Sequence, residues 1–233
     1  MSKASSSSPS DEPHVNPRPD PEARLPLTRE RVVEAALALA DAQGLAALSM
    51  RTLGASLGVQ AMSLYNHVAN KDEILDAIVD RVVSEIEVPS PLDPWKVAMR
   101  RRAISAHAVL LRHPWVCALL MSRVNAGPAM IRYIDATLGC LHQAGFSLEM
   151  ADQIWNTLDS HLYGFTLQEL NSPVKPQDYP AMAAAYLHML SPEAHPAMRA
   201  LTVLVATGRY NGLHDFEFGL GLLLDGFEQR KPC

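Results

Sequence analysis

Apolar residues recur at helical spacing over most of the chain, and no stretch shows the alternation of period two that is typical of a strand. The first helical run follows Thr28, a suitable N-cap, and a second follows Ser49. We expect a third short helix over residues 61–68. A fourth helix begins after Asn70 and carries an apolar stripe that extends to Ile86.

The pattern stays helical beyond three closely spaced prolines at positions 89, 91 and 94, and proline or glycine separates the later runs. The expected helices cover residues 95–112, 114–122, 128–144, 147–168, 180–190, 196–206 and 214–229. The sequence therefore predicts an all-α fold with a small N-terminal three-helix unit and a larger helical body.

Composition is that of an ordinary globular protein, with 48% hydrophobic and 19% charged residues. Residues 1–26 contain six prolines among polar residues, which predicts a disordered tail. No apolar run is long enough for a membrane span, and the first ten residues lack the apolar segment of a secretory signal. Three widely spaced cysteines favour neither a disulfide framework nor a metal site, so we expect a cytoplasmic protein.

The net charge of −5 argues against a protein that coats nucleic acid by bulk charge. The window from Ser49 to Lys71 nevertheless contains no acidic residue. It also contains two short helical patterns joined at Gly58, with the small residue Gly54 four positions earlier. This arrangement is typical of a helix-turn-helix whose surface faces phosphate, although a helical hairpin that only packs fits the spacing about as well.

Residues 27–59 (LTRERVVEAALALADAQGLAALSMRTLGASLGV) and 64–75 (LYNHVANKDEIL) resemble the DNA-binding domain of the tetracycline-repressor (TetR) family of bacterial transcription regulators. Residues 163–169 (YGFTLQE) and 216–228 (FEFGLGLLLDGFE) are similar to the dimerisation helices of its tetracycline-repressor-like C-terminal subclass. The resemblance implies a ligand-responsive repressor that binds a palindromic operator as a homodimer and associates with the nucleoid when bound.

The resemblance also implies where the domain boundaries of the chain lie. It implies a helix-turn-helix domain over residues 27–70, a connecting helix over 71–88, and a helical ligand-binding and dimerisation domain over 92–230. Two other interpretations remain open, namely a helical binding module or a small enzyme that has kept this fold without regulating DNA. The sequence lacks H-E-x-x-H and G-x-S-x-G motifs, so we expect no catalytic residues.

By the same resemblance, one set of residues faces the DNA bases: Ala61, Met62, Ser63 and Asn66. A second set contacts phosphates: Thr28, Arg51, Tyr65, His67 and Lys71. An asparagine can pair with adenine through two hydrogen bonds, whereas the base-facing set has no arginine to bind guanine. We therefore expect base recognition to favour A·T pairs.

In the body, the candidate residues for binding a small effector are Met99, Arg102, His107, Trp115, Met121, Trp155, Asp159 and Tyr163. Met and Trp at helical spacing serve a core as often as a pocket. The expected dimer interface comprises Ile154, Leu158, Leu162, Phe216, Gly219, Leu220, Leu223, Leu224 and Phe227, although these stripes could instead serve the core of one chain. The metal-chelating pattern of the tetracycline repressor is not recognisable, and we expect neither a metal nor a cofactor.

Overall fold

The computed structural model describes residues 26–231, and within that range every regular element is a helix. The α-helices are α1 (Arg29–Gln43), α2 (Met50–Ser56), α3 (Ala61–Leu64), α4 (Lys71–Val83), α5 (Trp95–Arg112), α6 (Val116–Ser122), α7 (Pro128–Gln143), α8 (Leu148–Leu170), α9 (Tyr179–Tyr186), α10 (Pro196–Ala206) and α11 (Phe216–Glu228). Three short 3₁₀ helices cover Leu45–Ala47, Pro176–Asp178 and Leu187–Met189. The predicted all-α fold is confirmed.

The predicted helix starts at Thr28, Ser49 and Asn70 are confirmed by capping hydrogen bonds. Each of these side chains accepts a hydrogen bond from a backbone N–H in the first turn of the helix that follows. Ser49 and Thr52 form a reciprocal capping box, with each side chain accepting from the other residue's backbone N–H. Local sequence therefore determines where α1, α2 and α4 begin.

Three predicted helices are shorter than expected. The connecting helix expected over 71–88 ends at Val83. The third helix of the chain ends at Leu64 rather than at residue 68, because the amides of Asn66 and His67 donate to the carbonyls three residues earlier and the chain continues as turns. The helix predicted over 180–190 ends at Tyr186 and tightens into a 3₁₀ turn.

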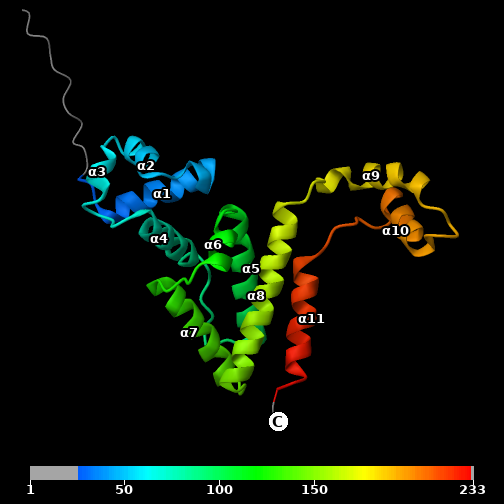
Figure 1. Cartoon of the computed structure of the whole chain (residues 1–233). Coiled ribbons are helices and arrows are strands. Elements are labelled where there is room, and N and C mark those ends of the chain that lie inside the picture. Colours follow the sequence, from blue (N-terminus) through cyan, green and yellow to red (C-terminus); the bar gives the residue numbers. More distant parts are fainter. Residues whose placement is uncertain (1–25, 232–233) are drawn as a thin grey trace, which may run out of the picture.

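The first three helices form a head at one end of the molecule, and α4 leads from this head into the body (Figure 1). In the body, α5 packs against α7 and α8, while α8 and α11 run side by side. Apart from Ala183, Leu190 and Val205, the buried apolar side chains form one continuous cluster from Val32 in the head to Leu224 in α11. Because α4 contacts α1 on one side and both α6 and α7 on the other, it joins the head to the ligand-binding region predicted from the sequence.

The helices α9 and α10 pack against each other and lie beyond the end of α8 that faces away from α7 (Figure 1). The large apolar side chains of Met189, in the 3₁₀ helix after α9, and of Met198 in α10 are exposed.

The residues of the predicted dimer interface divide into those buried in the chain's own core and those that stay accessible. Six of its residues are buried within a single chain, where they pack α8 and α11 into the core: Ile154, Leu158, Leu162, Phe216, Leu220 and Leu224. The three others, Gly219, Leu223 and Phe227, are half-buried. The opposite face of α11 instead exposes Phe218 (67%) and Leu222 (60%). The periodicity identified the apolar helices correctly, but it could not distinguish the stripe facing the chain's own core from the one facing outward.

The tail predicted over residues 1–26 lies outside the described residues except for Pro26. Over residues 26–231, no single helix is both long and apolar enough to cross a membrane, and only α5 and α6 taken together, with a bend of 115° between them, meet that test. In the same range, no three His, Cys, Asp or Glu side chains are grouped as metal ligands.

Candidate DNA-binding surface and ligand site

The turn between α2 and α3 depends on two glycines. A Cβ atom at Gly54 would lie 2.9 Å from the carbonyl oxygen of Val59 and 3.1 Å from the amide nitrogen of Ala61, so the start of α3 packs directly on α2. Gly58 has a φ of 67°, which is accessible to glycine at little cost. Both features are as predicted for a helix-turn-helix.

This packing exposes one side of α3. Leu64 and Val68 are buried and anchor the helix, whereas Met62 is 72% exposed. Among the other residues predicted to face bases, Asn66 is exposed, and Ala61 and Ser63 are half-buried. The surface also includes a residue that sequence reasoning missed, Gln60, which is exposed at the N-cap of α3 and makes no capping hydrogen bond.

The residues predicted to contact phosphate surround α3. Arg51 and Lys71 are exposed, on α2 and at the start of α4 respectively, and Tyr65 is 47% exposed rather than part of the core. His67 and Thr28 are half-buried, and Thr28 caps α1.

Glu73, the acidic residue two positions after Lys71, is bound to two partners within the head. Glu73 pairs with Arg29 of α1 (3.1 Å) and accepts a hydrogen bond from the amide of Ala69. The hydrogen bond from Ala69 holds the pKa of Glu73 below its ordinary value. These contacts join the first turns of α1 and α4, so they stiffen the base of the exposed surface.

Four of the candidate effector-binding residues meet inside the body. Arg102 of α5 is fully buried and donates to Asp159 of α8 (2.6 Å). The other carboxylate oxygen of Asp159 accepts from the indole N–H of Trp155 (2.7 Å) and the hydroxyl of Tyr163 (3.4 Å). Tyr133 of α7, which the sequence did not identify, places its ring 4.6 Å from the Arg102 guanidinium carbon. Burial raises the pKa of both tyrosines, so their hydroxyls stay protonated at neutral pH.

The structure places the remaining candidates differently. Met99 is buried on α5, one turn before Arg102. His107 contacts Glu169 (3.0 Å) and stacks on Phe216. Trp115 donates to Asp41 of the head, and Met121 is 56% exposed.

The helix α7 begins on a carboxylate supplied by α4. Asp80 accepts hydrogen bonds from the amides of Ala129 (2.9 Å) and Met130 (3.0 Å), so it caps a helix that has no side-chain cap of its own. A Cβ atom at Gly127 would lie 2.2 Å from an oxygen of Asp80, so only glycine leaves room for this contact. Because α7 also carries Tyr133, the wall of the Arg102 site is bonded directly to the connecting helix.

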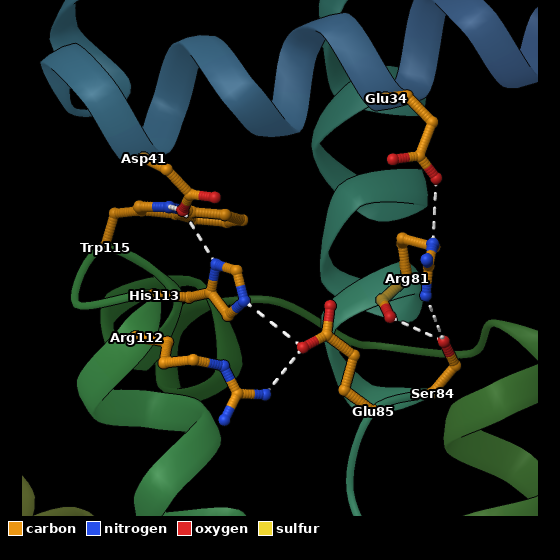
Figure 2. A network of polar contacts seen from close by, with 8 residues as sticks. All are labelled: Glu34, Asp41, Arg81, Ser84, Glu85, Arg112, His113 and Trp115. Carbon is orange, nitrogen blue, oxygen red and sulfur yellow. Dashed lines mark hydrogen bonds and ion pairs between the residues drawn. The ribbon is translucent and has the colours of Figure 1, made fainter.

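A second polar network joins the head to the body (Figure 2). His113, just after α5, donates through Nδ1 to Asp41 of α1 (2.7 Å), and its Nε2 lies 3.5 Å from Glu85. Arg112 also donates to Glu85 (2.7 Å), which follows α4. The network thus ties α1 and the end of α4 to the end of α5.

Comparison with known proteins supports both parts of this architecture. A model of "Bacterial regulatory proteins, tetR family" matches residues 32–78, and one of "Tetracyclin repressor-like, C-terminal domain" matches residues 88–231. The chain is 31% identical over 221 residues to an HTH-type transcriptional repressor, DrrR1, of Streptomyces coeruleorubidus, covering 91% of this chain and 81% of that protein.

Two further relatives agree with that assignment. The Streptomyces coelicolor TetR family protein ActR, solved in complex with actinorhodin, superimposes with a TM-score of 0.75 at 30% identity, covering 90% of this chain and 100% of ActR. A class E tetracycline repressor of Escherichia coli is 31% identical over 150 residues, covering 63% of this chain and 70% of that protein. The chain therefore belongs to the tetR family of bacterial regulatory proteins and is a helix-turn-helix transcriptional regulator.

Proposed function

We propose that the protein is a homodimeric repressor that binds a palindromic operator and releases it when a small molecule binds between α5, α7 and α8. The observation that carries the proposal is the exposed side of α3, which lies in a segment without acidic residues (49–71) and is fixed by the close packing at Gly54. Similarity to named repressors and to ligand-bound ActR supports it. The proposal assigns no catalytic activity to the chain.

The base-recognising residues are Met62, Ser63 and Asn66, joined by the exposed amide of Gln60. Asparagine and glutamine each match the hydrogen-bonding edge of adenine, and a methionine side chain can contact the methyl group of thymine. This chemistry favours A·T-rich half-sites. Arg51, Tyr65, His67 and Lys71 orient the helix by contacting phosphates on either side.

A single head offers few cationic groups to DNA, so tight binding requires two heads. Two recognition helices about 34–36 Å apart would reach successive major grooves of one palindrome. The face for pairing is the outer side of α8 and α11, where a groove lies beside Leu222. The groove is lined by Met150, Gln153, Thr157, Leu222, Leu223, Gly226, Phe227 and Arg230. A second copy of the same face would form a four-helix interface with it.

The response to a ligand would pass through α4. A ligand that displaces Tyr133 or shifts α7 pulls on Asp80, because two amides of α7 are bonded to that carboxylate. Movement of α4 then changes the separation of the two recognition helices. Such coupling requires only that the ligand binds the two arrangements with different affinity.

The test is a binding titration of the full chain with duplexes from the promoter region that adjoins its gene. We expect saturable, salt-sensitive binding to one duplex and at least tenfold weaker binding by Lys71→Ala. Lys175→Ala, which removes an exposed lysine outside the head, is the matched control and should bind as the wild type does. Absence of any retained duplex at low salt would refute the proposal.

A further inference from the structure

The guanidinium of Arg102 is only partly satisfied. Its Nη2 donates to Asp159, but Nε and Nη1 are both buried and have no hydrogen-bond partner among residues 26–231. Each buried N–H group without an acceptor costs about 1–3 kcal/mol, and such groups are rare in folded proteins. An arginine fully enclosed in this state indicates an acceptor that arrives from outside the chain.

The carboxylate of Asp159 cannot supply the missing acceptor. One of its oxygens accepts from Arg102, and the other is occupied by Trp155 and Tyr163. The carboxylate is thus held by three donors from two helices. The carboxylate balances the charge of the guanidinium, but it accepts no hydrogen bond from Nε or Nη1 of Arg102.

This charge balance restricts the kind of acceptor. With Arg102 already neutralised by Asp159 at 2.6 Å, a second carboxylate would leave an uncompensated negative charge in a buried site. An uncharged carbonyl oxygen can accept hydrogen bonds from these N–H groups without adding a buried charge. The site therefore suits a neutral acceptor better than an anion.

The surroundings restrict the rest of the ligand. Tyr133 stacks on the guanidinium, and Trp155 and Tyr163, which both donate to Asp159, are half-buried. Aromatic side chains in this arrangement favour a planar aromatic body. Arg102 itself is fully buried, so a ligand reaches its guanidinium only when neighbouring side chains move.

We infer that Arg102 recognises the effector by donating hydrogen bonds to a carbonyl oxygen of an uncharged, planar aromatic compound. This inference rests on the regulator function proposed above and names the class of its ligand. Trp155 and Tyr163 then flank the aromatic body, while Asp159 keeps the guanidinium charged and oriented.

The test compares three compounds with the same two-ring skeleton: 1-indanone with a carbonyl, indane with none, and indane-1-carboxylate with a negative charge. Dissociation constants come from titrating the indole N–H signal of Trp155 in ¹H–¹⁵N NMR spectra, assigned with Trp155→Phe. We expect 1-indanone to bind at least about tenfold more tightly than either of the others.

The control is the double variant Arg102→Met/Asp159→Asn, which removes both charges and so leaves no unpaired ion in the core. It should bind 1-indanone and indane alike and should keep its helical circular dichroism. Equal binding of indane and 1-indanone by the wild type, tighter binding of the carboxylate, a carbonyl preference that survives in the double variant, or no binding of any compound would overturn the inference. Operator binding is measured separately on the wild type, so its loss would count against the proposed function and not against the ligand class.

Discussion

The carboxylate of Asp80 in α4 accepts a hydrogen bond of 2.9 Å from the backbone amide of Ala129 in the first turn of α7. The connecting helix thus caps a helix of the body. Removing the carboxylate leaves two amides of α7 without an acceptor. Asp80→Ala should therefore lower the free energy of unfolding by about 1–2 kcal/mol, measured by urea denaturation. Asp135→Ala, on the exposed side of α7, should stay within about 0.5 kcal/mol of the wild type.

The contact between Asp80 and α7 also depends on Gly127, which lies against the Asp80 side chain. A methyl group at Gly127 would occupy the space now filled by the Asp80 side chain, so Gly127→Ala should displace the carboxylate. We expect Gly127→Ala to destabilise the protein, and the double variant with Asp80→Ala to cost less than the sum of the two single changes. Strict additivity in urea denaturation would show that the two residues act independently.

Substitutions on the head should distinguish residues that position the protein on the DNA backbone from residues that recognise the base sequence. Tyr65→Ala and Lys71→Ala should weaken binding to all duplexes alike, and Lys71→Ala should reduce the slope of log affinity against log salt by about one per bound chain. Asn66→Ala should instead relax discrimination at one base pair, at a cost of about 1–3 kcal/mol for the preferred base. These effects are measured by fluorescence anisotropy with single-base operator variants at several salt concentrations. Unchanged binding in all three variants would contradict the assignment of this surface.

The exposed face of α11 should be required for pairing. Phe218→Glu replaces an apolar side chain with a charged one. Because Phe218 is 67% exposed in the single chain, the monomer should fold normally. We expect light scattering after gel filtration to give the monomer mass, together with loss of operator binding. Glu217→Gln, beside it on α11, is the control and should remain dimeric. A dimeric Phe218→Glu protein would place the interface elsewhere.

The contacts of Glu73 predict a pH dependence. Because its pKa is lowered in the fold, Glu73 adds stability at pH values above its ordinary pKa of 4.5, and this contribution is lost as the pH falls through the lowered value. Glu73→Gln should therefore be less stable than the wild type at pH 7 and equally stable in strong acid. The difference should be below about 1 kcal/mol, since a third of the side chain is exposed (35%). A difference that persists unchanged in acid would mean that the ionised form is not responsible.

Local sequence signals predicted much of this fold. The caps at Thr28, Ser49 and Asn70 and the turn at Gly58 each depend on a residue and its immediate neighbours, so they could be identified before any tertiary contact was known. The early end of α3 was not predicted, because residues 65–67 keep backbone hydrogen bonds of the turn type and carry no glycine or proline that marks a helix end.

The long-range contacts account for the remaining differences. The Asp80 cap and the stacking of Tyr133 on Arg102 join residues from separate helices, and periodicity within one helix carries no information about them. The orientation of α11 was uncertain for the same reason. Its apolar residues cover more than one face, and the packing against α5 and α8 decides that Leu220 is buried and Leu222 exposed.

Two copies of the chain should read one palindrome through paired α3 helices. The most direct measurement is the stoichiometry and affinity of the protein on a duplex with both half-sites, compared with a duplex in which one half-site is scrambled. We expect two chains per intact duplex and at least a hundredfold weaker binding when one half-site is lost. A single chain that binds both duplexes with the same affinity would show that the recognition helices do not act as a pair.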